Sequence, residues 1–576
     1  MNAPFSRTLF DLLREQAQAR PDALAVICGE SGNTASDSPS TTTSTTTSTD
    51  TTSTTSTTST SYAALLARVQ HLAGALRAAG VARGDRIGLL VSNRIEWIEI
   101  FFASAAVGAV LVPFSTWSKP RELAFLLQDS GASMLFVQDR LGKDSLSEGL
   151  LAVLPQLAEH QPGGWQAPDF PQLRCVVMIG ETRLAGALGY AEFAGAGAPI
   201  TTTITTPMAD PLAPGDGAAA RDVSTILYTS GSTAYPKAVP MQHAAMIENG
   251  FNIGERQGLR AGDRVLLALP LFWSYGCANA ACATFTHGAT LVLQERFEPA
   301  GALELIERHA VTAIYTLPGM TAALVTHPDF TPARTASLRT GLTIGAPRDV
   351  ETAALVLGAS EICNIYGQTE SYGNCCVTWH HWPLARRQAV QGPPLPGVTV
   401  RIVDVDTGAV LPAGAQGLIE VTGYLTPGYA GKSQAQNTTA FTDDGFFRTG
   451  DLGCLTTDGD MQFAGRDGEM IKRAGINIAP AEVEELLQKH PGVALAGVTG
   501  APDPDKGEAI VAFVVARPGQ VLEPDELRRF CRAEASNYKA PDRIEICSSL
   551  PQTPTGKLLR RELRALAVAL PALTRN

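Results

Sequence analysis

The sequence predicts an α/β protein in which a large N-terminal domain, made of two α/β subdomains and a β-rich subdomain, is followed by a small α+β domain. Three observations support this prediction. In the first part of the chain, short apolar runs alternate with helical segments, a pattern typical of parallel sheets covered on both faces. Between residues 397 and 463, short strands are broken by Gly and Pro turns, which favours a small barrel or antiparallel sheet. After Arg466 comes a mixed segment of about 110 residues, the size of a small domain.

Composition limits the classes of protein that fit. The 576 residues include 45 basic and 56 acidic side chains, a formal net charge of −11. With 45% hydrophobic and 18% charged residues, the chain is too apolar to be disordered as a whole and too long for one ordinary domain. The acidic balance argues against a protein that mainly binds nucleic acid or an anionic membrane. The ten cysteines contain no CxxC pair, so we expect a reduced cytoplasmic protein without a zinc site or a disulfide framework.

The predicted elements follow the chain in order. A strand over residues 23–28 precedes an amphipathic helix over residues 62–79. The apolar run 101–114 predicts a buried helix leading into a core strand, because its 14 residues are fewer than the ~20 needed to cross a bilayer. Since the N-terminus also lacks the zones of a signal peptide, we do not expect an integral membrane protein. Further strands are predicted at residues 86–92, 133–137, 175–179, 223–228, 265–269, 290–293 and 311–316, and in the β-rich part at 400–405 and 417–421.

Two stretches have the composition of connecting segments. Residues 40–61 are Ser or Thr at every position except Asp50, and such a tract cannot form a core. It is interpreted as a disordered surface insertion, with a glycosylated or partner-binding stalk as the alternative. Residues 185–220 are rich in Ala, Gly, Thr and Pro, and we expect them to connect two subdomains.

The first motif with chemical content is VSTILYTSGSTAYPKAV, at residues 223–239. An apolar strand runs into a turn of hydroxyl residues, and a lysine follows. Backbone N–H groups and hydroxyls in a Gly-containing turn bind anions, and lysine adds a positive charge. The residues of this candidate phosphate site are Thr229, Ser230, Gly231, Ser232, Thr233 and Lys237. The Gly that precedes Lys-Ser/Thr in the Walker pattern is missing, and an ordinary Ser/Thr-rich loop is the alternative interpretation.

Four further motifs follow: NIYGQTE at 364–370, RTGDLG at 448–453, GRDGEMIKRAGINIAPAEVE at 465–484 and PQTPTGKLLRR at 551–561. In order and approximate spacing, the five motifs resemble those of the adenylate-forming (AMP-binding) superfamily, which includes acyl- and aryl-CoA synthetases, luciferases and the adenylation domains of peptide synthetases. The resemblance covers nearly the whole chain apart from the Ser/Thr tract. It implies an N-terminal AMP-binding domain, 1–465, and a mobile C-terminal domain, 466–576.

The resemblance implies an enzyme that uses ATP, Mg²⁺ and coenzyme A in two steps. A carboxylate attacks the α-phosphorus of ATP to give an acyl-adenylate, and a thiol then displaces AMP. This order is chemically reasonable because AMP is a far better leaving group than oxide, and phosphoryl chemistry mainly requires positioning and charge neutralisation. The first hypothesis is therefore an acyl-CoA synthetase. The alternatives are a stand-alone adenylation enzyme that loads the phosphopantetheine arm of a carrier protein, and a non-catalytic nucleotide-binding or scaffold protein.

The resemblance also assigns roles to single residues. The hydroxyl-rich turn and Lys237 are expected to hold the β- and γ-phosphates. Thr369 is expected to contact the α-phosphate, and Glu370 to ligate Mg²⁺, a hard cation that favours oxygen donors. Lys557 is expected to bridge the attacking carboxylate and the phosphate. For the nucleoside, Tyr366 is expected to lie against adenine, Gly345, Ala346 and Pro347 to form another wall, and Asp451 and Arg466 to contact the ribose.

The remaining expectations concern the hinge and the acyl pocket. Gly468 occupies the pivot position, where the family usually has Asp or Lys, and Lys472 matches the segment that faces the thiol tunnel in the second half-reaction. Trp273 stands where acyl-CoA synthetases commonly have His and α-amino-acid-activating domains have Asp, which weighs against an amino-acid substrate. The acyl pocket is expected to comprise Trp273, Ser274, Tyr275, Gly276, Thr343, Ile344 and Tyr372, a mixture that suits an aromatic or medium aliphatic acid. His243, His380 and His381 have no metal-ligand partners at useful spacing and are expected to be structural or at the surface.

Overall fold

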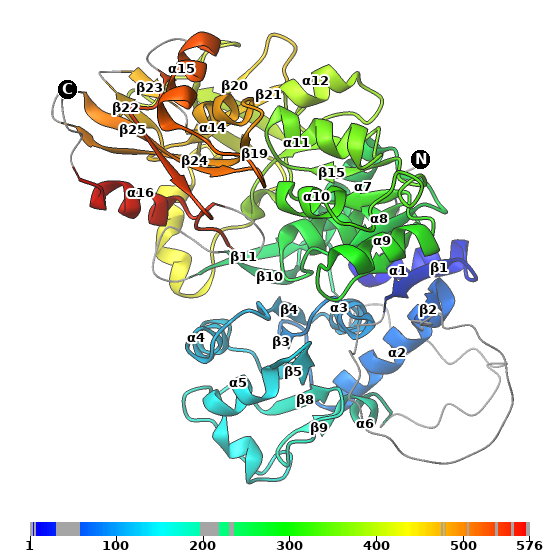
Figure 1. Cartoon of the computed structure of the whole chain (residues 1–576). Helices are drawn as coiled ribbons and strands as arrows, with labels where there is room; N and C mark the ends of the chain where they lie inside the picture. The colour runs from blue at the N-terminus through cyan, green and yellow to red at the C-terminus, as the bar shows by residue number, and fades with distance from the viewer. Residues whose placement is uncertain are drawn as a thin grey trace, which may run out of the picture.

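The computed structural model describes residues 4, 7–29, 58–195, 218–229, 236–473, 476–478, 480–503, 506–535, 539–553 and 558–571. It has the predicted architecture, a large N-terminal domain with two α/β units and a β-rich unit, followed by a small C-terminal domain (Figure 1). Within the described ranges, every helix is too short or too polar to cross a membrane.

The first α/β unit is a seven-stranded sheet in the order β11-β10-β4-β3-β5-β8-β9. All neighbouring strands are parallel except β10 and β11, which form an antiparallel pair. Phe136 packs into the core on the side of α3, whereas its neighbour Leu135 packs on the side of α4, as alternation along a strand requires. The strands are β3 (Arg86–Leu90), β4 (Val110–Pro113), β5 (Met134–Gln138), β8 (Cys175–Ile179), β9 (Leu188–Gly189), β10 (Val223–Thr229) and β11 (Lys237–Gln242), and the helices are α2 (Tyr62–Ala78), α3 (Ile95–Val107), α4 (Pro120–Ser130), α5 (Leu146–Val153) and α6 (Tyr190–Gly195).

The second α/β unit is an eight-stranded sheet in the order β17-β16-β15-β14-β12-β13-β1-β2. Its six inner strands are parallel, and antiparallel strands close both edges. The strands are β1 (Leu24–Cys28), β2 (Thr58–Ser61), β12 (Arg264–Leu267), β13 (Thr290–Leu293), β14 (Ala313–Tyr315), β15 (Thr340–Thr343), β16 (Cys363–Tyr366) and β17 (Cys376–Val377). The main helices are α1 (Leu9–Ala19), α7 (His243–Gln257), α8 (Cys282–Thr286), which continues a π-helical turn η2 (Tyr275–Ala281), α9 (Pro299–Arg308), α10 (Pro318–Val325), α11 (Pro347–Glu351) and α12 (Leu384–Ala389).

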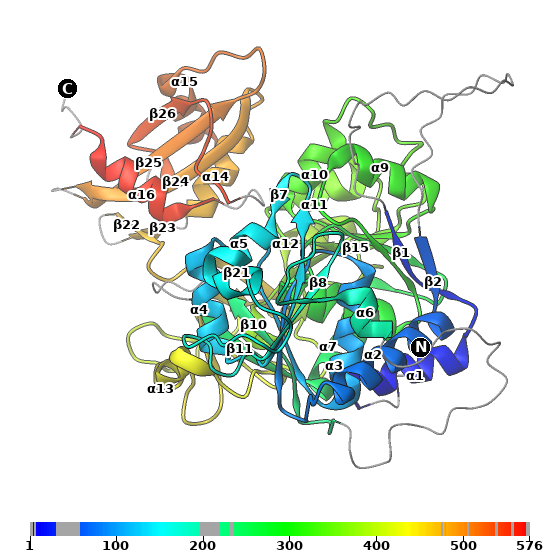
Figure 2. The same cartoon turned by 90° about the horizontal axis from the view of Figure 1, so that it is seen from below.

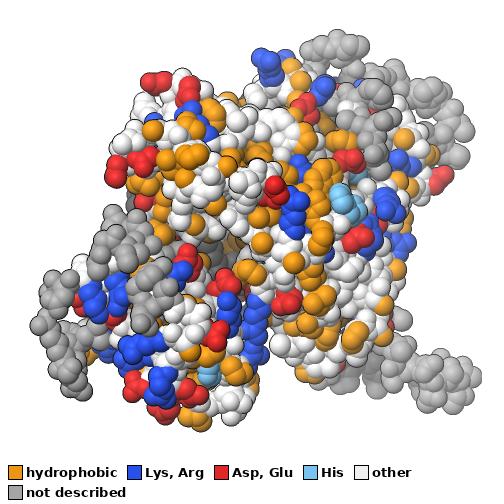
Figure 3. All heavy atoms as spheres, turned by 90° about the horizontal axis from the view of Figure 1, so that it is seen from above, with side chains coloured by type: hydrophobic (Ala, Val, Ile, Leu, Met, Phe, Trp, Pro, Cys, Tyr) orange, Lys and Arg blue, Asp and Glu red, His pale blue; other side chains and the backbone are white. Residues whose placement is uncertain are grey.

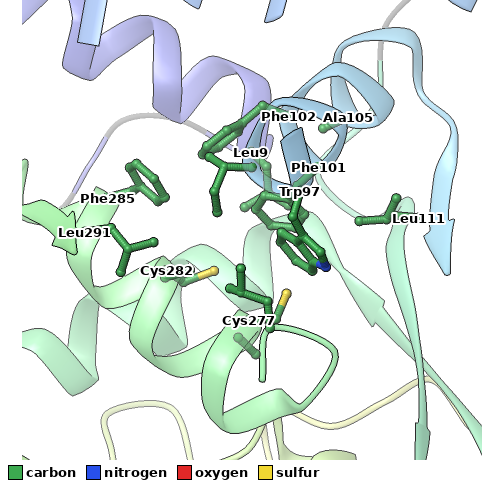
Figure 4. Packing of buried hydrophobic residues seen from close by; sticks show 14 of the residues in the cluster. Leu9, Trp97, Phe101, Phe102, Ala105, Leu111, Cys277, Cys282, Phe285 and Leu291 are labelled. Carbon is green, nitrogen blue, oxygen red and sulfur yellow. The ribbon is translucent and has the colours of Figure 1, made fainter. Parts of the chain in front are cut away.

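One hydrophobic core joins the two α/β units. Helix α3 of the first unit places Trp97, Phe101 and Phe102 against η2 and α8 of the second, where Cys277 and Phe285 face them (Figure 4). The rings of Phe102 and Phe285 meet edge to face with centroids 5.0 Å apart. Because these side chains are fully or almost fully buried, the two sheets form one packed body that can hold residues from both in fixed positions.

The interpretation of residues 40–61 as wholly disordered is wrong at its C-terminal end. Thr58–Ser61 form β2, which pairs antiparallel with β1, and the Ser61 hydroxyl accepts a hydrogen bond from Ala64 N–H at the start of α2. Threonine is β-branched and suits a strand, and β1 supplies the backbone partners that composition alone does not reveal. The rest of the tract, residues 40–57, lies outside the described residues.

The expectation that residues 185–220 connect two subdomains is also wrong. Residues 188–195 form β9 and α6, and residues 218–222 lead into β10. Both β9 and β10 belong to the seven-stranded sheet, so the segment runs from one part of this sheet to another. Residues 196–217 lie outside the described part of the chain.

The β-rich unit is an antiparallel four-stranded sheet, as predicted, and is followed by a five-stranded sheet with helices. Figure 2 shows this C-terminal domain standing to one side of the larger body. The first sheet contains β18 (Thr399–Val403), β19 (Gly417–Thr422), β20 (Phe447–Leu455) and β21 (Met461–Arg466), with α13 (Asn437–Ala440) beside it, and the C-terminal domain contains β22 (Ile471–Arg473), β23 (Ile476–Ile478), β24 (Val493–Asp503), β25 (Gly507–Ala516), β26 (Arg543–Cys547), α14 (Pro480–Gln488), α15 (Pro524–Glu534) and α16 (Arg560–Ala569). The domain boundary between residues 465 and 466 stays a prediction.

Candidate functional site

The predicted phosphate motif is a β-hairpin. Strand β10 ends at Thr229, which pairs with Lys237 at the first residue of β11. Residues 230–235, which include Ser230, Gly231, Ser232 and Thr233, lie outside the described residues. The expected roles of these four residues stay predictions, whereas Lys237 and Thr229 stand at the base of the turn.

Residues predicted to contact the nucleoside come together around Asp451 on β20. The Tyr366 hydroxyl, at the end of β16, donates to Asp451 Oδ2 over 2.9 Å, and Arg466 Nε on β21 lies 3.1 Å from Oδ1. The antiparallel register pairs Asp451 directly with Arg466, which explains the ion pair. Gln368 was missed by the sequence analysis, although it lies within NIYGQTE; its Nε2 donates to Asp451 Oδ2 over 2.5 Å. Burial, and then the adjacent Asp451 carboxylate, raise the pKa of Tyr366 well above its ordinary value, so the phenol stays a donor.

The Tyr366 ring and the segment 345–347 are positioned separately. Phe463 of β21 lies against Tyr366 with centroids 5.8 Å apart and planes 28° apart. Gly345 leaves no room for a side chain, because a Cβ there would come within 2.5 Å of Asp349 Oδ2. The same Asp349 oxygen accepts from Ala346 N–H over 2.9 Å and so caps α11, which begins at Pro347. The backbone of this segment is therefore held in a defined conformation, and its contact with a nucleotide stays a prediction.

The residues predicted to bind the phosphates and Mg²⁺ are linked by a tyrosine that the sequence analysis missed. Glu370 is buried in the short turn after β16, and Tyr429 donates to its Oε1 over 2.6 Å. Lys237 Nζ lies 3.5 Å from the Tyr429 hydroxyl and 4.8 Å from the ring centroid. Burial, and then the Glu370 carboxylate, raise the pKa of Tyr429. Among the described residues, no hydrogen bond reaches the other carboxylate oxygen, Glu370 Oε2, which leaves an anionic oxygen donor of the kind that Mg²⁺ prefers.

The predicted acyl side of the site carries a cluster of three aromatic rings. Trp273 and Phe272 follow β12, and Trp117 comes from the β4–α4 loop of the other sheet. Trp117 lies edge to face with both, at centroid distances of 5.4 Å and 5.2 Å, and it is 39% exposed. The hydroxyl oxygen of the next residue, Ser274, lies 3.1 Å from the hydroxyl oxygen of Thr369. The rings therefore adjoin the turn that carries Thr369 and Glu370, and Trp117, which the sequence analysis missed, belongs to this wall.

Most of the other predicted pocket residues are buried in the wall. The Thr343 hydroxyl accepts from Thr316 Oγ1 over 3.2 Å, and the Tyr372 hydroxyl accepts from Gln242 N–H over 2.9 Å. Tyr275 is also buried, and Gly276 has no room for a Cβ, which would come within 2.2 Å of the Pro270 carbonyl oxygen. Ile344, in contrast, is 41% exposed. Direct contact of these residues with a substrate stays a prediction.

The predicted hinge is a turn with a left-handed backbone conformation, which favours glycine. Gly468 has φ +82°, a left-handed value, within a turn closed by Glu469 N–H donating to Arg466 O over 3.0 Å. The backbone of Lys472 pairs with Asn477 in the β22–β23 hairpin. The side chain of Lys472 and all of Lys557 lie outside the described residues, so their roles stay predictions.

The two domains meet beside the predicted nucleotide wall. Arg348 of α11 donates to the Gln488 carbonyl oxygen of α14 over 2.7 Å. A cavity of about 410 Å³ adjoins this contact and is lined by Pro347, Arg348, Glu351, Gln388, Glu485, Gln488, Lys489, His490, Pro491 and Arg517. Figure 3 shows the surface from above, where a furrow separates the C-terminal domain from the larger domain.

Comparisons with known proteins agree with the resemblance drawn from the motifs. The family model of AMP-binding enzymes matches residues 13–430, and that of the AMP-binding enzyme C-terminal domain matches residues 482–557. A feruloyl-CoA synthase of Amycolatopsis is 32% identical over 88% of this chain and 93% of its own, and a mitochondrial medium-chain acyl-CoA ligase of Mus musculus is 29% identical over 88% and 82%. The solved structure of the anthranilate CoA ligase AuaEII with anthranoyl-AMP has a TM-score of 0.80 at 24% identity and covers 98% of each chain.

Proposed function

Because this chain belongs to the AMP-binding enzyme family and is an ATP-dependent acyl-CoA synthetase, we propose that its nucleotide spans the site from Tyr366 and Asp451 to Glu370 and Lys237. The enzyme activates a carboxylic acid to an acyl-adenylate with ATP and Mg²⁺ and transfers the acyl group to coenzyme A. The observation that carries the proposal is that motif residues from separate strands meet at one segment, residues 366–370: Asp451 is held by Tyr366 and Gln368, and Lys237 is linked to Glu370 through Tyr429.

In this proposal the chain's own residues bind and orient the reactants. Asp451 and Arg466 hold the ribose, while Lys237 and the β10–β11 turn hold the β- and γ-phosphates. Thr369 binds the α-phosphate, at the position where its hydroxyl already lies 3.1 Å from that of Ser274. Glu370 supplies a carboxylate oxygen to Mg²⁺, which, when bound, neutralises the charge of the phosphates.

Two lysines whose side chains lie outside the described part of the chain complete the proposal. Lys557 stabilises the negative charge that develops as the carboxylate meets the α-phosphate, and Lys472 acts in the second step, after the C-terminal domain has turned about Gly468. The proposed boundary at 465/466 places this glycine just inside the moving domain. A left-handed turn of exposed residues can absorb such a rotation, because glycine populates both signs of φ.

We further propose an aromatic or medium aliphatic acid without an α-amino group as the substrate. Apolar ring surface beside Thr369 is supplied by Trp117, Phe272 and Trp273. None of these side chains carries a carboxylate that could form an ion pair with a substrate ammonium group. The two relatives described above are named as a feruloyl-CoA synthase and a medium-chain acyl-CoA ligase, which agrees with this proposal. We also propose a cytoplasmic location, which is supported by ten cysteines without a disulfide.

The test is pyrophosphate release across a panel of acids, with Lys557→Ala as the matched inactive variant. We expect at least one aromatic or medium-chain acid to stimulate release and the variant to lose nearly all of it. The proposed roles fail if Lys557→Ala adenylates at the wild-type rate. Free coenzyme A and a phosphopantetheinyl carrier protein are then compared as acceptors, since faster loading of the carrier would favour the stand-alone adenylation enzyme. Lys472→Ala should slow thioester formation more than adenylation, and equal loss in both would contradict domain rotation.

A further inference from the structure

Tyr429 lies between two side chains of opposite charge. Its hydroxyl donates to Glu370 Oε1 over 2.6 Å, and Lys237 Nζ lies 3.5 Å from the same hydroxyl. A phenol hydroxyl can donate one hydrogen bond and accept another, so it can serve both neighbours at once. Tyr429 is 4% exposed and Glu370 is buried, whereas Lys237 is half-buried.

The backbone fixes Tyr429 independently of its hydroxyl. Ala430 N–H donates to the Ala238 carbonyl oxygen over 3.0 Å, and Ala238 N–H donates to Ser433 Oγ over 3.0 Å. On the other side, Asn437 Oδ1 accepts from Tyr429 N–H over 2.7 Å, and Asn437 Nδ2 donates to the Tyr429 carbonyl oxygen over 3.1 Å. The segment is thus attached to the first residues of β11, and the ring is held at a set distance from them.

The ring also belongs to a small apolar cluster. Val239 of β11 and Phe447 of β20 are buried with it, and Phe441 packs beside it at a centroid distance of 6.2 Å. The cluster joins the strand that carries Lys237 to the strand that carries Asp451. These contacts involve the ring alone, so replacing Tyr429 by Phe should preserve them.

The hydroxyl of Tyr429 lies between the two charges. Lys237 and Glu370, both within the described part of the chain, form no ion pair within 4.0 Å. Because Glu370 is buried, its attraction to a nearby ammonium is stronger than in bulk water, and a direct pair would neutralise both groups before any ligand arrived. With the phenol between them, the ammonium keeps donors for an anion, and the carboxylate keeps Oε2 for a cation.

We propose that Tyr429 is a positioning residue for the adenylation step: it separates Lys237 from Glu370 and orients the Glu370 carboxylate, so that each remains available to the Mg²⁺-bound triphosphate. This inference rests on the proposed function, which assigns Lys237 to the phosphates and Glu370 to Mg²⁺.

The experiment measures the dissociation constant of Mg²⁺–ATP by calorimetry without acid, and the Mg²⁺ dependence of ATP–pyrophosphate exchange with acid. For Tyr429→Phe we expect binding to weaken about tenfold and the Mg²⁺ concentration at half-maximal rate to rise similarly, because a hydrogen bond to a charged group is lost. The rate at saturating Mg²⁺ should change by less than about threefold. Tyr424→Phe is the matched control, since Tyr424 donates a comparable 2.7 Å bond to Glu248 Oε2, outside the proposed constellation, and we expect no change.

Four outcomes would count against the inference or its premise. Unchanged Mg²⁺–ATP binding in a folded Tyr429→Phe would overturn the inference, as would an equal loss in the Tyr424→Phe control. If Tyr429→Phe does not fold, Asn437→Ser removes the clamp on Tyr429 and should weaken Mg²⁺–ATP binding, and normal binding in that variant would count against the proposal. Glu370→Gln tests the premise separately: if it leaves the Mg²⁺ requirement unchanged, the assignment of Glu370 to Mg²⁺ fails whatever Tyr429 does.

Discussion

The two ends of the nucleotide site hold a buried carboxylate in different ways. Asp451 accepts from Tyr366, Gln368 and Arg466, which together occupy both of its oxygens. Glu370 accepts from Tyr429 at one oxygen, and no described residue donates to the other. A carboxylate with both oxygens engaged is held rigidly and can orient a neutral sugar, whereas one with an open oxygen can take a cation. The nucleoside end is therefore assembled in the free protein, while the phosphate end is left to be completed by its ligand.

Removing the charge of Glu370 at the phosphate end should have the largest effect on activity. In Glu370→Gln the amide oxygen can still accept from Tyr429, so the fold should persist, but the anionic ligand for Mg²⁺ is lost. We expect ATP–pyrophosphate exchange at saturating substrates to fall about a hundredfold or more. A melting temperature close to that of the wild type is the control. A loss of less than tenfold would show that the two carboxylates do not differ as described.

Acid should destabilise the fold next to strand β11, which carries Lys237 at the phosphate end of the site. His243 follows β11 directly and is fully buried; its Nδ1 accepts from Leu9 N–H over 3.3 Å. Burial lowers the pKa of His243 to about 4, although Asp222 and Asp11 partly oppose this shift. The unfolded chain therefore binds more protons between about pH 6.5 and pH 4, and the stability present above this range is lost as the pH falls through it.

The size of this acid effect follows from the lowered pKa. Between pH 7.5 and pH 5 we expect His243 to account for a loss of about 2 kcal/mol in the free energy of unfolding, roughly a 30-fold change in the unfolding equilibrium. Urea unfolding at the two pH values measures it, with His243→Gln as the control in which this part of the pH dependence disappears. Equal pH dependence in both proteins would show that His243 does not titrate as its burial requires.

At the nucleoside end, the substitution Asp451→Asn should have a milder effect on activity. The amide oxygen still accepts from Tyr366, but its NH₂ group cannot pair with Arg466. We expect the KM for ATP to rise about tenfold, with a smaller change in kcat, because a charge-assisted hydrogen bond is lost from binding. The KM for the acid should stay unchanged, and an equal rise in both would point to a general disturbance of the fold.

The smallest effect is expected for Tyr366→Phe. Gln368 and Arg466 still hold Asp451 in this variant, so the KM for ATP should rise by about threefold or less. This result, set against the larger change expected for Tyr429→Phe, is the sharpest test of the comparison. If Tyr366→Phe proved the more damaging of the two, the nucleoside end would depend on its phenol and would not be redundant.

The sequence predicted the parts of the site that depend on local motifs. Tyr366 and Glu370 flank a turn that follows an apolar strand, and the structure brings Tyr366 to Asp451, 85 positions later, because β20 and β21 lie beside that turn. Most inner strands of the two α/β sheets were predicted from apolar runs, since buried parallel strands are apolar at successive residues, but β15 was not among them.

The rest depends on tertiary pairing, which has no local signal. Tyr429 reaches Lys237 only because Ala430 pairs with Ala238, almost two hundred residues away. Trp117 joins Trp273 across two different sheets. The strand at residues 58–61 was missed for the same reason, because its Ser/Thr composition predicts disorder until β1 supplies a partner.

The pairing of Cys28 with Thr58 has a practical consequence. The chain leaves the eight-stranded sheet at Cys28, the last residue of β1, and returns to it at Thr58 of the edge strand β2, directly opposite, so an insertion between these two residues costs little closure entropy. A reporter protein or an affinity handle inserted here would begin and end at adjacent points, and neither strand would have to move. This edge is therefore the natural attachment point for following the enzyme, because β2 lies at the opposite edge of the sheet from β16 and β17, which adjoin the proposed nucleotide site.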